Sequence, residues 1–144
     1  MRIAIGSDHA GFDLKEYLRA ALAEEGYEID DLGTHDRSSC DYPDFAAAVG
    51  RAVAEGRADR GILICGTGIG MAIAANKIPG VRAACCSEPV SARLTRQDND
   101  SNVLTLGGRL IGPLMALEIA RVWLTTPFAG GRHQRRVDKI RALE

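Results

Sequence analysis

This 144-residue chain lacks a charge excess, a membrane-length apolar run and any linker-like stretch. Its 18 Lys and Arg residues against 19 Asp and Glu give a formal net charge of -1. A chain so near neutrality has no general attraction to nucleic acid or to an anionic membrane, so we expect neither as a partner. No apolar run reaches the ~20 residues needed to cross a bilayer, and the first residues have none of the features of a signal peptide. We therefore expect a single cytoplasmic domain over residues 1–144.

Cysteine is also scarce, with only four residues, at positions 40, 65, 85 and 86. Their spacing does not match that of metal ligands, so we expect no metal centre. Cys85 and Cys86 are adjacent in an apolar run, where a strand would point them to opposite faces. Free cysteine is a typical core residue in a reducing compartment, and we expect both to be buried.

Strand-like and helix-like patterns alternate along the rest of the chain with short connections. Apolar runs predict strands at residues 2–6, 27–32, 61–65, 81–86 and 102–106. Helix formers, with proline near several starts and glycine after several ends, predict helices at residues 12–25, 43–55, 89–96 and 113–124, with others after residue 70 and from about residue 131. This alternation predicts an α/β fold, a three-layer α/β/α sandwich around a Rossmann-like, five-stranded parallel sheet.

Cys65 stands where one of these strands meets a glycine-rich turn. The run 62–64 before it is apolar without alternation, as in a parallel strand covered on both faces. The turn 66–70 contains three glycines and precedes a run of helix formers. Backbone N–H groups at such a turn bind anions and favour the thiolate form of a cysteine. The pattern therefore indicates a reactive cysteine beside an anion-binding loop.

The same turn could instead bind a nucleotide. Glu88 follows Gly66 at about the spacing of the ribose-binding acid in dinucleotide-binding folds. Against this, Met71 occupies the place of the third glycine in that fingerprint, and no Gly-Lys-Ser/Thr follows that would make a Walker A loop. A non-catalytic nucleotide-binding module stays open, although such a module would need neither Cys65 nor the arginines described below.

Polar residues follow other strands of the predicted sheet. Asp8 and His9 come after the first strand, and Arg109 comes after the fifth. Ligands of open parallel sheets bind beyond the carboxyl ends of the strands, where the strand order reverses. A flavodoxin-like order, with the first strand beside the third, would bring Asp8, His9 and Cys65 to one crevice. Asp8 could equally serve as an ordinary cap of the following helix.

The C-terminal segment 130–136 carries three arginines. Arg132 and Arg136 are spaced i and i+4, which places them on one side of a helix with His133 close by. Two guanidiniums on one face suit a phosphate monoester through charge-assisted hydrogen bonds. Because the net charge is near zero, we favour a local phosphate clamp over an RNA-binding patch.

These motifs resemble those of the ribose-5-phosphate isomerase B family, which also includes galactose-6-phosphate and allose-6-phosphate isomerases. They occur in order along the chain, at residues 6–12, 41–43, 64–70, 74–77, 86–89, 102–104 and 131–136. The resemblance implies aldose–ketose isomerisation through an enediolate, with no metal or cofactor. It also implies a homo-oligomer, a dimer or a tetramer, with active sites shared between subunits and the helix from about residue 131 completing the interface.

The resemblance implies a role for each matching residue. Cys65 would be the catalytic base, and Thr67 would help to move protons between substrate oxygens. The amides of residues 66–70 would hold the enediolate. Substrate sugar and phosphate would be bound by the following residues, with some arginines from the partner subunit: Asp8, His9, Tyr42, Gly66, Gly68, Ile69, Gly70, Asn99, Arg109, Arg132, His133 and Arg136.

One position departs from the family pattern. Ribose-5-phosphate enzymes usually carry a histidine before the Asn-Asp pair, as the acid that opens the furanose ring, and this chain has Asp98 there. A carboxylate is ionised at neutral pH and is a poor acid. A tetrose 4-phosphate cannot form that ring and needs no such acid. We expect conversion of ribose 5-phosphate to ribulose 5-phosphate, with erythrose or erythrulose 4-phosphate and a hexose 6-phosphate, such as allose or galactose 6-phosphate, as alternatives.

Overall fold

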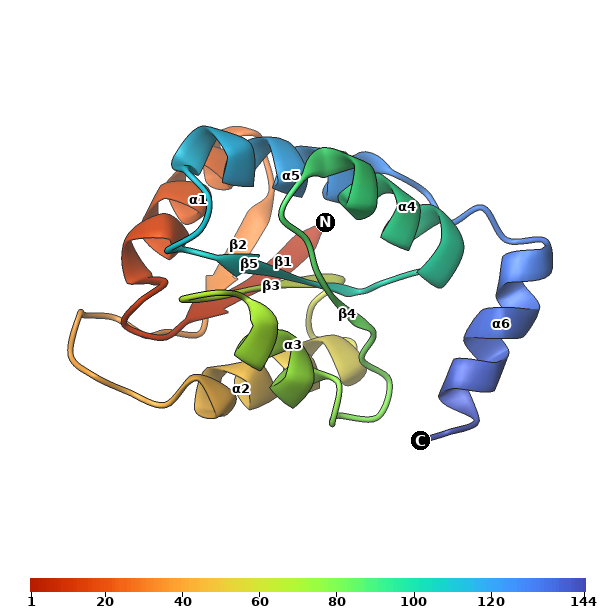
Figure 1. Ribbon diagram of the computed structural model, residues 1–144. Helices are drawn as coiled ribbons and strands as arrows, with labels where there is room; N and C mark the ends of the chain where they lie inside the picture. The colour runs from red at the N-terminus through yellow and green to blue at the C-terminus, as the bar shows by residue number, and fades with distance from the viewer.

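The chain folds as the three-layer α/β/α sandwich that the sequence predicts. The computed structural model describes residues 1 to 144 (Figure 1). Its elements in chain order are β1 (Arg2–Ser7), α1 (Phe12–Glu24), β2 (Glu28–Asp31), α2 (Tyr42–Ala54), β3 (Arg60–Cys65), α3 (Ile69–Ala75), β4 (Ala83–Cys85), α4 (Pro89–Asn99), β5 (Val103–Gly107), α5 (Pro113–Thr125) and α6 (Arg132–Arg141).

The five strands form one parallel sheet in the order β2-β1-β3-β5-β4. β1 lies beside β3, as we expected from a flavodoxin-like order. The last two strands are exchanged relative to that order, so that β5 and not β4 is the second neighbour of β3. Cys65 is therefore paired with Gly107, and the turn after β5 lies next to the cysteine.

Helices cover both faces of the sheet, with α1, α4 and α5 on one side and α2 and α3 on the other (Figure 1). β3 shows why its sequence does not alternate. Ile62 and Ile64 point into the core under α1 and α5, whereas Leu63 points into the core under α2 and α3. Because both faces are buried, every position of the strand after Arg60 is apolar, and the prediction of a doubly covered strand is confirmed.

β4 starts later than predicted, because the backbone N–H group just before it is bonded to a side chain and not to the neighbouring strand. The Arg82 amide donates to Asn102 Oδ1 at 2.8 Å, so residues 81 and 82 do not continue the strand. The expectation that both adjacent cysteines are buried is half wrong. Cys86 is 3% exposed, but Cys85 is an exposed residue of this edge strand.

α4 extends beyond the predicted end at residue 96 and carries Asp98 and Asn99 on its last turn. The helix ends where Asp100 takes a left-handed conformation, with φ of +47°, without the glycine that usually marks such an end. The buried Arg96 stabilises this ending by donating to Asp100 Oδ1 at 2.8 Å and to the Ser101 carbonyl at 2.5 Å.

α6 stands apart from the sandwich, at the end of the sheet opposite to the carboxyl ends of the strands (Figure 1). It contacts α4, and Val137 is its only buried residue. None of the helices combines the length and the apolar character that a membrane crossing requires.

Candidate active site

The turns after β1, β3 and β5 are joined by backbone hydrogen bonds. The Asp8 amide donates to the Ile64 carbonyl at 3.2 Å, and the Gly108 amide donates to the Cys65 carbonyl at 2.8 Å. The Arg109 amide donates to the Gly66 carbonyl at 3.0 Å. The turns at the carboxyl ends of these strands therefore lie side by side, and backbone hydrogen bonds fix their relative positions.

Cys65 is 5% exposed and lies at the last position of β3. Its Sγ accepts a hydrogen bond from the Gly68 amide at 3.2 Å. Gly68 has φ of +80°, and a Cβ there would stand 2.8 Å from the Leu106 carbonyl carbon, so glycine is required. Thr105 Oγ1 donates to the Gly68 carbonyl at 2.7 Å and holds the turn in place. The turn thus keeps an N–H group directed at the sulfur, where it can stabilise negative charge.

Thr67 and Ile69 lie on the exposed side of the same turn. The Ile69 amide donates to Thr67 Oγ1 at 3.2 Å, which orients the hydroxyl. Cys85 Sγ contacts the Thr67 carbonyl at 3.7 Å and would lie 3.1 Å from a Cβ on Gly68. Sequence reasoning placed Cys85 in the core and missed this contact. The signal that could have found it is its position at the end of a strand whose neighbour, β5, also ends beside the turn.

Arg109 and Tyr42 flank the glycine turn from two sides. Arg109 lies over Gly66, because a Cβ on that glycine would stand 3.4 Å from Arg109 Cδ and Nη1. Tyr42 begins α2, and its ring would lie 2.8 Å from a Cβ on Gly70. The absence of side chains at these glycines leaves room for both residues. Arg109 and Tyr42 therefore frame the turn that holds Cys65.

Asp8 is 6% exposed and organises the turn after β1. Its Oδ1 accepts hydrogen bonds from the amides of Ala10 and Gly11 at 3.0 and 3.1 Å. The residue is therefore the centre of a turn that precedes α1, whose N-cap is Gly11 without a side-chain cap. His9 follows Asp8, and its Nδ1 accepts a hydrogen bond from the Cys40 amide at 3.2 Å.

The chain thus brings one part of the predicted site together at the carboxyl ends of the strands. We call it the Cys65 group, and its members are Asp8, His9, Tyr42, Cys65, Gly66, Thr67, Gly68, Ile69, Gly70 and Arg109.

The remaining predicted residues lie elsewhere in the same chain. We call them the α6 group, comprising Asp98 and Asn99 at the end of α4 and Arg132, His133 and Arg136 on α6. α4 ends where β5 is about to start, so the five residues of β5, about 16 Å, separate this group from the Cys65 turn. His133 Nε2 lies 3.5 Å from Asp98 Oδ1, and their side chains are 13% and 44% exposed.

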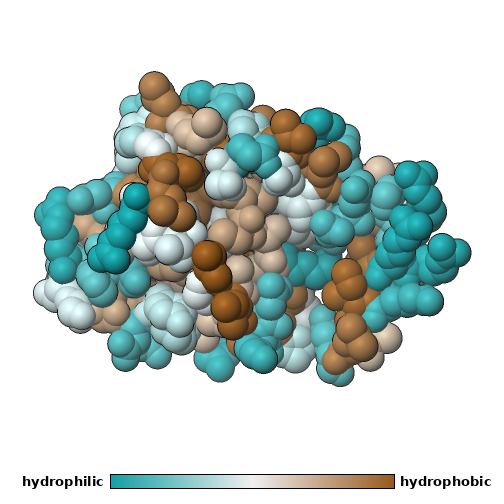
Figure 2. All heavy atoms as spheres, viewed as in Figure 1, coloured by the Kyte–Doolittle hydropathy of each residue, from teal (hydrophilic) through white to brown (hydrophobic).

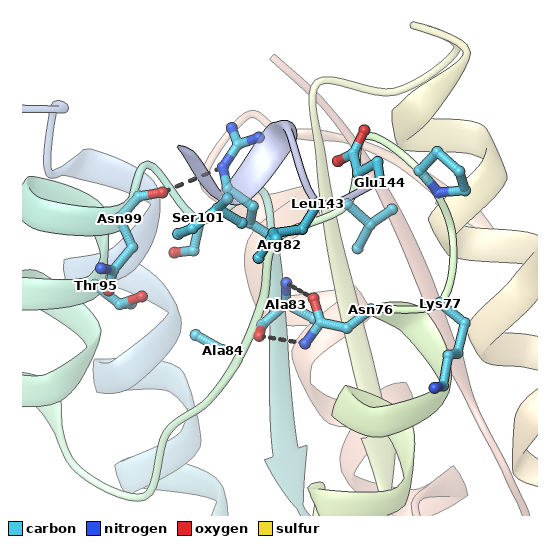
Figure 3. A pocket seen from close by; sticks show the side chains of 13 residues that line it. Asn76, Lys77, Arg82, Ala83, Ala84, Thr95, Asn99, Ser101, Leu143 and Glu144 are labelled. Carbon is cyan, nitrogen blue, oxygen red and sulfur yellow. Dashed lines mark hydrogen bonds between the residues drawn. The ribbon is translucent and has the colours of Figure 1, made fainter. Parts of the chain in front are cut away.

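A cavity of about 640 Å³ adjoins the α6 group (Figure 3). Asn99 contributes to its wall, as do Asn76 and Lys77 after α3 and the chain end at Leu143 and Glu144. No residue of the 65–70 turn lines this cavity. This cavity is therefore not where the cysteine lies.

Glu88 does not support a dinucleotide site. Its carboxylate accepts hydrogen bonds from the amides of Val90 and Ser91, at 2.6 and 2.9 Å, and so caps α4. The hydrogen bonds from Ser91, and then that from the Val90 amide, lower the pKa of Glu88. A carboxylate engaged in capping is not free to bind a ribose hydroxyl, which weakens the nucleotide-binding alternative.

Comparison with known proteins agrees with the motifs in the sequence. The family model described as Ribose/Galactose Isomerase matches residues 3–140. Ribose-5-phosphate isomerase B of Escherichia coli is 52% identical over 143 residues, which cover 99% of this chain and 96% of that protein. D-erythrulose-4-phosphate isomerase of Pectobacterium atrosepticum is 43% identical over 142 residues, which cover 97% of this chain and 93% of that protein.

A solved structure extends the likeness to the fold. Clostridium thermocellum ribose-5-phosphate isomerase B matches with a TM-score of 0.98 at 52% identity, over 99% of this chain and 97% of that one. The resemblance inferred from the motifs is confirmed by these matches. This chain therefore belongs to the ribose/galactose isomerase family, and it is an aldose–ketose isomerase.

Proposed function

We propose that this chain interconverts ribose 5-phosphate and ribulose 5-phosphate through an enediolate, with Cys65 as the base. The observation that carries the proposal is the Cys65 sulfur, which accepts a hydrogen bond from the Gly68 amide where the turns after three strands lie together. The identity to ribose-5-phosphate isomerases along the whole chain supports the choice of substrate. We place the reaction in the cytoplasm, which suits four cysteines that are all free thiols.

The chemistry requires a proton to move between adjacent carbons. The Cys65 thiolate takes the proton from C2 of the open-chain aldose, and the electrons pass to the carbonyl to give an enediolate. The Thr67 hydroxyl then exchanges protons with the two substrate oxygens, and Cys65 returns its proton to C1. Fixed amide donors stabilise the negative oxygen in between, and one such donor can contribute roughly 3–4 kcal/mol to the barrier reduction.

A single chain does not assemble all of these parts, and we propose that a second copy supplies the rest. Neither Arg132 nor Arg136 forms a salt bridge within the chain, so both guanidiniums are free to bind phosphate. The α6 group of one subunit would then face the Cys65 group of its partner. The active sites would be shared in a homo-oligomer, a dimer or a tetramer.

The exposed apolar side chains support this association. Ile69 and Ile73 on α3 are 54% and 62% exposed, and Val90 and Leu94 on α4 are 54% and 41% exposed. Figure 2 shows apolar atoms over α3 and α4 on one face of the molecule, and this face lies between the two groups of site residues. Apolar side chains gathered on one face are typical of protein–protein interfaces.

Mixing two inactive variants tests the proposed function and the shared site together. Assayed at ribose 5-phosphate concentrations below the wild-type KM, Cys65→Ser and Arg136→Ala should each lose most isomerisation. After subunit exchange by mild denaturation and refolding, the mixture should recover about a quarter of the wild-type activity, because random pairing leaves a quarter of the sites intact. Exchange is verified by native mass spectrometry. No recovery in verified mixed oligomers would contradict the shared site, and full activity of Cys65→Ser alone would contradict the base.

Asp98 supports a second candidate function, isomerisation of a tetrose 4-phosphate. The residue replaces the ring-opening histidine that the family resemblance implies, and a tetrose 4-phosphate forms no furanose ring. The relative that acts on D-erythrulose 4-phosphate shows that family members include a tetrose phosphate isomerase. Measuring kcat/KM for ribose 5-phosphate, erythrose 4-phosphate and allose 6-phosphate distinguishes the candidates, since the physiological substrate class should have the highest value.

A further inference from the structure

His9 has its backbone fixed beside the end of β3. The Asp8 carboxylate closes a tight turn around it, through the amides of the two residues that follow His9. Gly11 lets this turn lie against the strand, because a Cβ at that position would stand 2.4 Å from the Ile64 carbonyl oxygen. His9 is therefore held next to the residue that precedes Cys65, with little freedom in its main chain.

The ring of His9 is fixed by a different segment, the loop between β2 and α2. The Cys40 amide donates to His9 Nδ1 at 3.2 Å, and Cys40 Sγ lies 4.0 Å from the same nitrogen. A backbone N–H group can only donate, so Nδ1 must carry a lone pair to accept this bond. The single proton of a neutral imidazole then lies on Nε2, because the bond made by one ring nitrogen decides the tautomer of the other.

The loop that presents Cys40 is itself tied to the turn it contacts. At its start, the Ser7 amide donates to the Gly33 carbonyl at 2.7 Å. Near its middle, Arg37 donates to Asp13 Oδ1 at 2.6 Å and lies over the Phe12 ring, 5.2 Å from its centre. Both anchors belong to β1 and the first turn of α1. These contacts hold the loop against the turn that carries His9, which places the Cys40 amide in line with the ring.

We propose that Cys40 is a positioning residue whose amide holds His9 as a neutral imidazole protonated on Nε2. His9 then donates a hydrogen bond from Nε2 to a substrate oxygen and acts neither as a base nor as an imidazolium acid. A proton on Nδ1 would point at the Cys40 N–H group, so this contact selects the tautomer with its proton on Nε2. His9 consequently does not replace the ring-opening histidine that Asp98 displaces. The inference rests on the proposed function, in which His9 binds the substrate.

The direct test is the protonation pattern of the His9 ring in the free protein. Nitrogen-15 NMR of imidazole-labelled wild type at neutral pH distinguishes a protonated from an unprotonated ring nitrogen, and the His9→Gln spectrum identifies which of the three histidine signals is lost. We expect a proton on Nε2 and none on Nδ1. A proton on Nδ1, or on both nitrogens, overturns the inference. No substrate is present, so the result does not depend on which phosphosugar the enzyme converts.

Two pairs of variants test the consequence for activity. Glutamine can place an N–H donor near the position of Nε2, whereas asparagine places one near Nδ1, so His9→Gln should exceed His9→Asn about tenfold in kcat/KM. Cys40→Pro removes the amide hydrogen, and Cys40→Ala is its matched reference because it also lacks the thiol. The proline variant should show mixed tautomers and about tenfold lower kcat than the alanine variant, with a smaller change in KM.

The outcomes are decisive even where proline disturbs the loop. If Cys40→Pro unfolds, the wild-type spectrum still shows which nitrogen of His9 is protonated. The comparison of His9→Gln with His9→Asn still shows whether Nε2 is the donor. Equal activity of His9→Gln and His9→Asn overturns the donor role of Nε2. An unchanged tautomer in a folded Cys40→Pro protein overturns the positioning role of Cys40.

Discussion

The Cys65 group and the α6 group are held by different means. The Cys65 group stands on turns whose backbones are hydrogen-bonded to one another and to buried strands. The α6 group lies on the last turn of α4 and on α6, a helix that buries only Val137. A chain can fix an enediolate-stabilising loop with its own core, whereas arginines that would reach another subunit, as we propose, must remain exposed in the single chain.

This difference separates two kinds of function. Stabilising an enediolate needs donors placed to within a fraction of an ångström before the reaction, which a rigid turn supplies. Binding a phosphate needs mainly charge and reach, which Arg132 and Arg136 would supply from a helix surface in the proposed site. We therefore expect substitutions in the Cys65 group to lower kcat and substitutions in the α6 group to raise KM.

The largest effect should come from Cys65→Ser. A serine hydroxyl ionises far less readily than a thiol, so the variant should fold and bind phosphosugar but lose about 10³-fold in kcat, within the range for removal of a general base. The measurement is the initial rate of ribulose 5-phosphate formation together with a thermal unfolding curve. Cys86→Ala is the matched control, because it removes a thiol that is buried in the core away from the turn. Turnover of Cys65→Ser within tenfold of wild type would remove the base role from Cys65.

Arg132→Ala and Arg136→Ala should have the next largest effect. Each removes a guanidinium that can make charge-assisted hydrogen bonds with phosphate, so KM should rise about 50-fold while kcat changes less. Binding of unphosphorylated ribose should be nearly unaffected. Arg141→Ala is the control, because nine residues along a helix place Arg141 on the opposite side from Arg132. The clamp is wrongly placed if Arg141→Ala weakens binding as much as the other two.

Most of the Cys65 group was predictable from sequence because its members end or follow apolar strands, and the carboxyl ends of parallel strands share one edge. Tyr42, which begins α2, came only from the family resemblance. The order of β4 and β5 was not predictable, because both are short apolar runs that fit either position. The length of α4 was missed because Asp100, not glycine, takes the left-handed conformation at its end. The exposure of Cys85 was missed for a related reason, since apolar composition does not distinguish an edge strand from a central one. That the α6 group lies apart from Cys65 depends on tertiary packing.

Asp98→His changes the chemistry of the α6 group by replacing a carboxylate with an imidazole. An imidazole at this position can protonate the ring oxygen of a furanose, so kcat/KM for ribose 5-phosphate should rise about tenfold. Turnover of erythrose 4-phosphate should stay the same or fall, since it has no ring to open. Asp98→Asn separates the gain of an imidazole from the loss of the carboxylate that faces His133. Efficient use of ribose 5-phosphate by wild type, with no gain in the histidine variant, would leave the tetrose alternative without its main support.

Val137→Ala should loosen α6 without unfolding the sandwich. Val137 is 2% exposed and is the only buried side chain of the helix, so losing two methyl groups should cost about 2 kcal/mol of local docking energy. Hydrogen exchange should become faster in residues 132–141 and stay unchanged in β3 and β5. Ile140→Ala, which truncates a side chain that is 43% exposed, should have a smaller effect. Equal acceleration of exchange in the central strands would show that α6 is part of the cooperative core after all.

The smallest effect concerns alkaline pH and the core that supports the Cys65 group. Burial raises the pKa of Cys86 to about 11, with smaller contributions from Cys85 and Glu88. Because the folded-state pKa is above the unfolded value near 8.5, the contribution of this thiol to stability is complete below that value and is lost as pH rises through about 11. Between these pH values the unfolded chain has released a proton that the native chain retains, so the free energy of unfolding must fall.

Urea unfolding at pH 8 and pH 10.5 measures this effect. The free energy of unfolding should fall between the two pH values by on the order of 1 kcal/mol more in wild type than in Cys86→Ala. Equal losses of unfolding free energy in wild type and Cys86→Ala would assign the alkaline sensitivity to another group.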